Sequence, residues 1–299
     1  MNKNIIFCGT PEFAGASLIS LFQNQKKLQY KISGVITIPD KISGRGQKKT
    51  QSFIKKKSIE LGLNVFQPTK LNDTYFIRKI KELEPDLIIV VAFKKLPKEL
   101  YNIPKFGTIN LHASLLPNFR GAAPINWVII KGEKITGLTT FFINEKIDHG
   151  DIIMQKKIHI DENWHASDLY NELMKYSDEI IKNTIRKVFN RNNKLIKQTE
   201  LTNNSQYYAR KINKSDFYIS QKFLNNQTIK NIYNYFRGMS PPGVKVKLII
   251  ENYENEIIEK RIIIIKVESL IMHEKTKTDI SKSIQIDRVN NNIIMTDHN

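Results

Sequence analysis

The 299-residue sequence contains one cysteine, Cys8, and no apolar run long enough to cross a membrane. A single cysteine excludes an internal disulfide framework and a zinc site built from several cysteines. Because Cys8 lies within the apolar run of residues 5–8, we expect a buried thiol there. A membrane-spanning helix needs about 20 apolar residues, and no basic start precedes a long apolar core, so we expect a cytoplasmic chain without a membrane partner.

The sequence also lacks the two common glycine-rich motifs that bind phosphate. A strand, a glycine turn and a helix fit residues 4–22, but Gly-x-Gly-x-x-Gly is missing and Glu12 would repel a phosphate from the helix N-terminus. Gly-Arg-Gly at residues 44–46 is too short for a P-loop and is not followed by Lys and Ser or Thr. Dinucleotide and P-loop nucleotide sites are therefore excluded.

Acidic residues are few relative to basic ones. The chain has 47 Lys and Arg against 29 Asp and Glu, a net charge of +18 and a pI near 9.7. This balance favours an acidic partner, with nucleic acid before an anionic membrane surface. The abundance of Lys, Asn and Ile is also typical of AT-rich genomes, so compositional bias is the alternative source of the charge.

Apolar runs and amphipathic segments alternate through the first half of the chain. The pattern predicts helices that begin near residues 11 and 50 and span 74–83, 124–131 and 166–190, with strands at residues 4–9, 30–37, 64–66, 87–92, 108–113 and 136–143. The first part of residues 38–57 is expected to be a mobile basic loop. This alternation is typical of an α/β fold with a Rossmann-like, mainly parallel sheet and helices on both faces.

The length predicts two domains. Residues 190–208 are rich in Asn, Lys and Gln and are predicted to be a linker. Beyond them, a helix at residues 228–237 and strands at 244–250 and 259–267 suit a small β-barrel with an entry helix. We therefore expect one domain at residues 1–189 and a second at residues 209–299.

A polar pair at the end of the 108–113 strand is the strongest site candidate. Asn110 and His112 are two residues apart, so they share one face of the strand at its carboxyl end, where open α/β sheets bind ligands. From spacing alone, the alternative is that both side chains only satisfy backbone groups at a strand end. A turn at residues 114–117 follows the pair.

Asp148, His149 and Asp151 form a second polar cluster. Together with His112 they would suggest a metal site. However, Gly150 predicts a tight turn between two strands, and the adjacent Asp148 and His149 cannot easily face one ion. We therefore expect no metal.

The residues of several segments resemble the motifs of a known family. Asn-x-His-x-Ser-Leu-Leu-Pro at residues 110–117, followed by Arg-Gly-Ala-Ala-Pro at residues 120–124, resembles the active-site segment of the 10-formyltetrahydrofolate-dependent formyltransferases. Phe-Cys-Gly-Thr-Pro-Glu-Phe-Ala at residues 7–14 resembles the opening of those members that act on methionyl-initiator tRNA. The resemblance covers about the first 190 residues and implies a C-terminal OB-like barrel that helps to hold tRNA.

The resemblance also implies roles for individual residues. Asn110 and His112 would act on the oxyanion and the protons of formyl transfer, and Asp148 would be the acidic partner of His112. The folate-binding turn would be Ser114, Leu115, Leu116 and Pro117, and the contact with the tRNA acceptor end would come from Arg45, Lys48 and Lys49.

The implied reaction moves a formyl group from 10-formyltetrahydrofolate, a donor substrate, to the free amino group of methionyl-initiator tRNA. The product, formylmethionyl-tRNA, starts translation, and the expected enzyme is a monomer that needs no metal. The sequence departs from the usual family residues at positions 93–97 and at His149, where the family usually has threonine. The chain ends at Asn299, before the final strand that is usual in the family.

Two alternatives stay open. A glycinamide ribonucleotide formyltransferase would share the Asn, His, Asp and Ser-Leu-Leu-Pro pattern, but would lack the Gly-Thr-Pro-Glu-Phe-Ala opening, the Gly-Arg-Gly insertion and a C-terminal domain. A catalytically silent RNA-binding relative of the same fold is the other alternative. The intact Asn110, His112 and Asp148 argue against it.

Overall fold

The computed structural model describes residues 3–43, 48–191, 194–201, 206–251, 257–264, 283–287 and 292–296. The chain forms two compact units. One comprises residues 1–124, 135–159 and 170–209, and the other comprises residues 125–134, 160–169 and 210–299. No helix in the described ranges is both long enough and apolar enough to cross a membrane.

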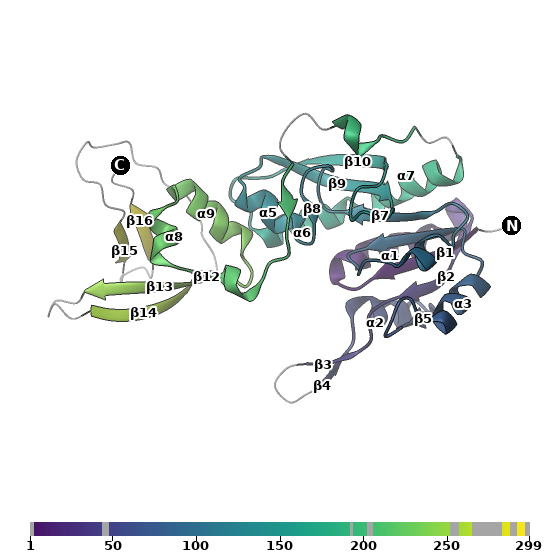
Figure 1. Ribbon diagram of the computed structural model, residues 1–299, viewed down its shortest axis with the longest axis horizontal. Coiled ribbons are helices and arrows are strands. Elements are labelled where there is room, and N and C mark those ends of the chain that lie inside the picture. The colour runs from purple at the N-terminus through teal and green to yellow at the C-terminus, as the bar shows by residue number, and fades with distance from the viewer. Residues whose placement is uncertain are drawn as a thin grey trace. The chain divides into compact units, whose positions relative to one another are not determined.

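A seven-stranded sheet forms the centre of the first unit (Figure 1). Parallel pairing joins five of its strands, and the remaining two, β9 and β10, pair antiparallel. The prediction of a mainly parallel α/β sheet is confirmed. In spatial order the strands are β10 (Ile152–His159), β9 (Ile135–Phe142), β7 (Thr108–His112), β6 (Leu87–Val91), β1 (Lys3–Gly9), β2 (Tyr30–Ile36) and β5 (Val65–Phe66).

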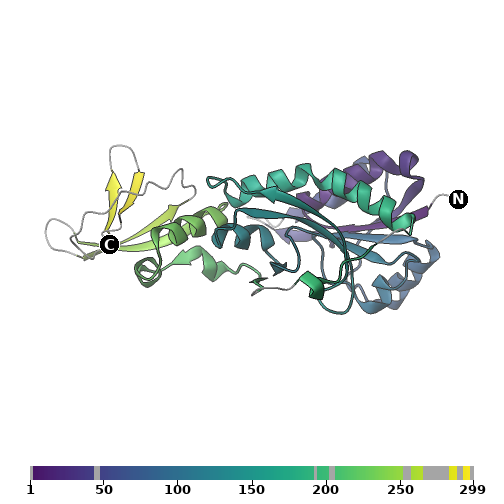
Figure 2. The same cartoon turned by 90° about the horizontal axis from the view of Figure 1, so that it is seen from above.

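Helices cover both faces of this sheet. On one face, α1 (Glu12–Leu28) packs against α7 (Ser177–Phe189), and Figure 2 shows the two helices along the same side of the strands. On the other face, α3 (Thr74–Glu82) and α4 (Lys98–Tyr101) contribute to one apolar cluster with β1 and β6. Cys8 belongs to that cluster, is fully buried as expected, and its burial raises the pKa of the thiol.

The alternation along β1 and β6 explains the two layers. Ile6 on β1 and Val90 on β6 point into the cluster with α3 and α4. The residues that alternate with them along each strand therefore point to the opposite face. Fully burying one such side chain is worth about 1.5–3 kcal/mol. Both strands are buried along their whole central part, as expected for a sheet with helices on both faces.

The single helix predicted over residues 166–190 is wrong. The structure has α6 (Ala166–Lys175) and α7, separated at Tyr176. There the Tyr176 N–H donates to Leu173 O, three residues back, and the buried Ser177 hydroxyl donates to the same carbonyl. The shift to the tighter i→i−3 pattern at Tyr176 marks the break between the two helices.

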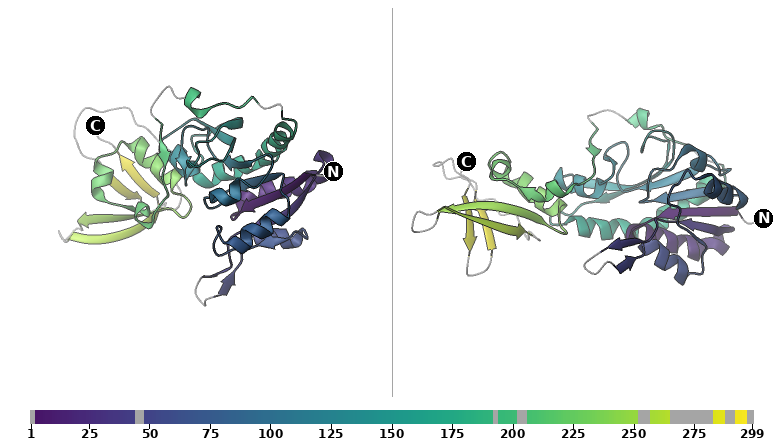
Figure 3. Two further views of the ribbon diagram at one scale, coloured as in Figure 1. Left: turned by 45° about the vertical axis from the view of Figure 1, so that its right-hand side comes forward. Right: turned by 60° about the horizontal axis from the view of Figure 1, so that its bottom comes forward.

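The basic segment after β2 is not only a loop. It contains β3 (Lys41–Ser43) and β4 (Lys48–Thr50), which pair antiparallel and project beyond the sheet in Figures 1 and 3. We call these two strands the basic hairpin. The predicted helix then starts at α2 (Phe53–Glu60), where the Ser52 hydroxyl accepts from the Lys55 N–H as an N-cap.

Short elements complete the first unit. Parallel bridges join β8 (Arg120–Gly121) to β11 (Tyr208–Ala209), and a 3₁₀ turn spans η1 (Gln198–Leu201). Gly121 has a φ of +119°, and a Cβ there would lie 2.5 Å from the Ala209 carbonyl oxygen, so only glycine fits this close backbone approach.

The second unit is built around α9 (Ile229–Gly238), which the sequence predicted and which Thr228 caps. Its apolar face packs with β12 (Tyr218–Ile219), α8 (Gln221–Asn225) and β13 (Val244–Glu251) in one cluster. The strands pair in the order β12, β13, β14 (Ile257–Ile264), and a separate pair is formed by β15 (Ser283–Asp287) and β16 (Asn292–Thr296). The remaining elements are α5 (Pro124–Ile130) and η2 (Lys214–Phe217).

Candidate active site

Strand β7 brings Asn110 and His112 to one face of the sheet. Asn110 pairs with Val90 on β6 and with Phe141 on β9, so its backbone is fixed from both sides. Because Val90 faces α3 and α4, Asn110 and His112 face the same way. Asn110 is half-buried, and its amide has no hydrogen-bond partner among the residues that the structure describes. This amide is available to a bound molecule.

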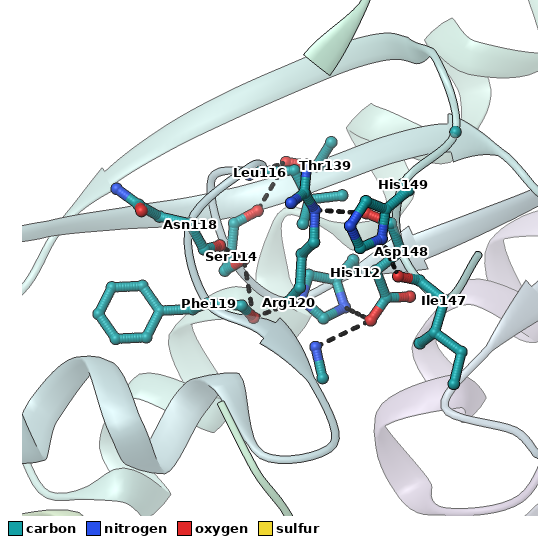
Figure 4. A network of polar contacts seen from close by, with 12 residues as sticks. His112, Ser114, Leu116, Asn118, Phe119, Arg120, Thr139, Ile147, Asp148 and His149 are labelled. Atoms are coloured by element: carbon teal, nitrogen blue, oxygen red, sulfur yellow. Dashed lines mark hydrogen bonds and ion pairs between the residues drawn. The ribbon is translucent and has the colours of Figure 1, made fainter. Parts of the chain in front are cut away.

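The ring of His112 is buried, with 6% of its surface exposed, and both of its nitrogens face protein groups. Nε2 lies 2.9 Å from the Phe119 carbonyl oxygen. A carbonyl can only accept, so Nε2 is the protonated donor in this arrangement. Nδ1 lies 3.8 Å from Oδ2 of Asp148, within ion-pair range but too long for a hydrogen bond (Figure 4).

Asp148 lies in the turn between β9 and β10 with a φ of +57°, an uncommon conformation that aspartate tolerates better than most residues. Three donors hold it. The Gly121 N–H donates to Oδ2 at 2.9 Å, and the Asp148 carbonyl accepts from Arg120 Nε and from Gln198 Nε2, each at 3.0 Å. The turn therefore presents the carboxylate to His112 from a fixed position.

Arg120 and Gln198 also bond each other. Gln198 Oε1 accepts from Arg120 Nε at 2.9 Å and from Nη2 at 2.6 Å, while Gln198 Nε2 donates to the Gly150 carbonyl at 2.8 Å. Partial burial lowers the pKa of the Arg120 guanidinium, and the Asp148 charge opposes that shift. The contacts of Gln198 with Arg120 and with the turn were not predicted from the sequence, because Gln198 stands alone in a polar stretch without any motif.

The turn at residues 114–117 is tied to the two antiparallel strands. Thr139 Oγ1 on β9 donates to Ser114 O at 2.6 Å and accepts from the Leu116 N–H at 3.1 Å. Gln155 on β10 donates to Leu116 O at 2.8 Å, and the Ser114 hydroxyl donates to Asn118 O at 2.7 Å. Leu116 is buried, and Leu115 and Pro117 are half-buried. No motif in the sequence indicated Thr139 or Gln155.

His149 does not join Asp148 in a cluster of metal ligands. Its ring is exposed, and Nδ1 lies 2.5 Å from the Ile147 carbonyl oxygen. Within the described ranges, no group of three or more His, Cys, Asp or Glu side chains is arranged to hold a metal ion. In Figure 4 the Asp148 carboxylate points toward His112.

Of the predicted tRNA-contacting residues, Lys48 and Lys49 belong to β4 of the basic hairpin. Arg45 lies outside the described residues, and only the backbone of Lys48 is described. Lys49 is exposed, with 75% of its side chain accessible, and its Nζ lies 3.9 Å from Asp40. The half-buried Asp40 accepts from Gln67 at 2.8 Å and from Lys55 at 2.6 Å, and these bonds hold its pKa below the ordinary carboxyl value.

Comparison with known proteins identifies a family that the sequence matches. The model of the family described as formyl transferase matches residues 2–185. A methionyl-tRNA formyltransferase from Clostridioides difficile is 42% identical over 243 residues, which are 79% of this chain and 74% of that protein.

Two solved structures share the fold. A sugar N-formyltransferase from a Shewanella species superposes with a TM-score of 0.64 at 19% identity, covering 91% of this chain and 100% of that one. An N-formyltransferase from Helicobacter canadensis, solved with folinic acid and dTDP-3-aminofucose, superposes with a TM-score of 0.61 at 21% identity, covering 85% and 90%. At these identities the likeness concerns the fold alone.

Proposed function

The chain belongs to the formyl transferase family, among the methionyl-tRNA formyltransferases, and we propose that it formylates the free amino group of methionyl-initiator tRNA. The formyl donor is 10-formyltetrahydrofolate, and the product is formylmethionyl-tRNA for translation initiation. The folate-type ligand in the related Helicobacter canadensis structure supports this class of donor. The reaction takes place in the cytoplasm.

One observation carries the proposal for the site. Asn110 offers an unpaired amide beside His112 on the same strand face, and the His112 ring faces Asp148 at 3.8 Å. A neutral donor, an imidazole and a carboxylate are the three groups that acyl transfer to an amine uses.

The reaction needs charge stabilisation and a proton transfer. The methionyl amine forms a bond to the formyl carbon, and the carbonyl electron pair moves to oxygen. Asn110 donates a hydrogen bond to that oxyanion, an interaction typically worth about 2.7–4 kcal/mol when it is removed from an oxyanion hole. As the intermediate collapses, the bond from carbon to N10 of the folate breaks, the amine gives up a proton, and N10 gains one.

His112 handles the protons and Asp148 orients its ring. Nε2 now donates to the Phe119 carbonyl, so it must release that oxygen before it can exchange a proton with the substrate. A substrate polar group that takes the place of the Phe119 carbonyl keeps the ring bonded throughout. Hydrogen bonds of this kind are often longer before the substrate binds, which is consistent with the 3.8 Å separation of His112 and Asp148.

Ser114, Leu115, Leu116 and Pro117 form the folate-binding turn. The turn follows β7 directly, so a ligand on it lies next to the end of the strand that carries His112. Its bonds to Thr139 and Gln155 support a preformed binding surface rather than a loop ordered by the ligand.

The tRNA is bound by Arg45, by Lys48 and Lys49 of the basic hairpin, and by the C-terminal part of the chain. The net charge of +18 supports a polyanionic partner. We assign residues 1–189 to the catalytic domain and 209–299 to an OB-like barrel that contacts tRNA. Residues 190–208 connect the two, and the described part of this connection packs on the first unit. The active species is a monomer.

The deciding experiment offers the purified chain radiolabelled 10-formyltetrahydrofolate and one of two acceptors. Methionyl-initiator tRNA should gain the label, and glycinamide ribonucleotide should not. Label on glycinamide ribonucleotide alone would establish the first alternative. Tight tRNA binding without transfer to either acceptor would establish a catalytically silent RNA-binding protein.

A further inference from the structure

Gln198 is the most completely bonded side chain near the proposed site. Its amide oxygen accepts two hydrogen bonds from Arg120, and its amide nitrogen donates to the carbonyls of Asp148 and Gly150. An amide offers two donor hydrogens and two acceptor lone pairs, so all four positions are used. With 3% of the residue exposed, water does not replace these bonds easily.

Apart from these bonds, the turn that carries Asp148 is held by the Gly121 N–H on the Asp148 carboxylate and by the exposed ion pair of Lys98 with Glu145, each at 2.9 Å. Asn144, Glu145, Lys146 and His149 are exposed, and Ile147 is 50% exposed, so the turn is not held by burial of apolar side chains. A segment with little apolar burial depends on its hydrogen bonds for a fixed position. Arg120, Gln198 and the Asp148 carbonyl form a closed triangle of such bonds.

Gln198 comes from a distant part of the sequence. It belongs to η1, after α7, and Ile196 beside it exchanges backbone hydrogen bonds with Ile152 at the start of β10. The segment thus runs along the end of the sheet next to the Asp148 turn. Only a side chain that both accepts from Arg120 and donates to the two turn carbonyls satisfies every partner at this position.

We propose that Gln198 is a positioning residue for the formyl-transfer reaction. It fixes the backbone of the Asp148 turn, so that the carboxylate faces His112, and it holds Arg120 against the same carbonyl. This inference rests on the proposed function, because it assigns Gln198 a task in that reaction. Gln198 itself touches neither substrate.

Gln198→Glu gives the sharpest test because it nearly preserves shape. A carboxylate still accepts both Arg120 bonds, but it places an oxygen against the Asp148 and Gly150 carbonyls, where the amide nitrogen donated. We expect kcat to fall about 10- to 100-fold, since small misplacements of reacting groups cost that much, with little change in KM for tRNA or folate. Gln198→Met should lower kcat at least as far.

The matched control is Gln206→Glu. Gln206 Oε1 accepts from Nη1 of the same Arg120 at 2.6 Å, yet Gln206 is exposed and no bond joins it to either turn carbonyl among the described residues. It should keep wild-type kcat. In an Asp148→Asn background, Gln198→Glu should add no further loss, because its effect acts through Asp148.

A second readout does not need substrate. In protein labelled with ¹⁵N-histidine, the His112 ring resonances should shift in Gln198→Glu in the same direction as in Asp148→Asn, and stay unchanged in Gln206→Glu. Unchanged His112 resonances, a wild-type kcat in Gln198→Glu, or losses that simply add to those of Asp148→Asn would overturn the proposal. If the wild-type chain transfers no formyl group, the proposed function fails, while the resonances still decide whether Gln198 positions Asp148.

Discussion

The carboxylate of Asp148 faces the ring of His112 across 3.8 Å, through the same oxygen that accepts the Gly121 N–H at 2.9 Å. That oxygen is therefore held by a neutral backbone donor before any substrate arrives. The His112 ring is held in turn by the Phe119 carbonyl. Both members of the pair are therefore anchored by backbone groups of the protein.

The first prediction follows from this anchoring. Asn110→Ala and His112→Ala should each lower the rate of formyl transfer by about 10² to 10³, the usual effect of losing one oxyanion donor. Asp148→Asn should cause a similar loss, because it removes the charge that orients His112. Single-turnover formylation measures the chemical step, and tRNA affinity, measured separately, should be almost unchanged. Near wild-type rates in all three variants would contradict the assignment of the site.

A second prediction concerns the folate-binding turn. Thr139→Val keeps the shape of the side chain but removes the hydroxyl that bonds both Ser114 O and the Leu116 N–H. The unpaired buried groups should lower the free energy of unfolding by about 1–3 kcal/mol. The turn also loses its fixed position, so KM for 10-formyltetrahydrofolate should rise while KM for tRNA stays constant.

Thr140→Val is the control for this variant. Thr140 is the next residue on β9, equally buried, and its hydroxyl bonds Thr184 on α7 at the opposite face of the sheet. It should lose comparable stability without any change in the folate KM. An equal rise in both variants would show that the folate effect is only general destabilisation.

The sequence predicted what depends on local patterns. Buried strands such as β1 and β6 have continuous apolar runs, and the two-residue spacing of Asn110 and His112 fixes their common face. The polar residues of the Asp148 turn were also identified from the sequence, as a turn between two strands. Their approach to His112 follows from β9 pairing next to β7, and before the structure only the family resemblance indicated it.

What the sequence did not predict is a single long-range contact, a local helix break and two very short strands. Gln198 is 50 residues from Asp148, and no periodicity marks a lone glutamine in a polar stretch. The break at Tyr176 was hidden because residues 166–190 keep helical spacing on both sides of it. The strands of the basic hairpin were missed because they are three residues each and flank glycines.

Metal removal gives a third prediction. The described side chains that could bind a metal form no group of three, and His149 contacts a carbonyl rather than Asp148. Formyl transfer by a chain treated with EDTA and then desalted should equal that of untreated protein. Activity abolished by the chelator and restored by zinc would show that the turn at residues 148–151 acts as a metal site.

A fourth prediction uses pH and the second unit. Hydrogen bonds from Arg210, at 2.6 and 2.7 Å, lower the pKa of Asp216 from its ordinary value of 3.8. A lowered carboxyl pKa stabilises the folded state above the ordinary value, and this contribution is lost as the pH falls through the lowered pKa. Arg210 is about half exposed, so the pair contributes only about 0.5–1 kcal/mol.

Asp216→Asn should therefore destabilise the second unit at pH 7 and should match the wild type only when the pH is below the lowered pKa of the folded-state carboxyl, which lies under 3.8. Both tryptophans, Trp127 and Trp164, lie in that unit, so tryptophan fluorescence during urea unfolding reports on it. The exposed Glu133→Gln in the same unit is the control. A constant difference between Asp216→Asn and the wild type from pH 7 to pH 3 would mean that the carboxyl charge contributes nothing.

The last prediction separates function from compositional bias in the basic hairpin. If its cations only reflect genome composition, replacing Arg45, Lys48 and Lys49 with alanine should change little. If they contact tRNA phosphates, the triple variant should bind tRNA more weakly and with a shallower salt dependence. Each lost phosphate contact lowers the slope of log affinity against log salt by roughly 0.7–0.9. Lys55 is left out of the set because its ammonium is already bonded to the half-buried Asp40.

Arg45 should matter most within the set. Its planar guanidinium can bond a phosphate or a base edge at two points, and the glycines on either side let the backbone approach closely. Arg45→Ala should weaken tRNA binding and slow turnover through poorer placement of the methionyl amine, while folate binding is spared. The matched control is Lys26→Ala, an exposed cation in the last turn of α1. Affinities measured across a salt series should differ between the two variants in both magnitude and slope. Equal and small effects would make the hairpin an ordinary solvated surface, and the tRNA assignment would then rest on the similarity to the methionyl-tRNA formyltransferases alone.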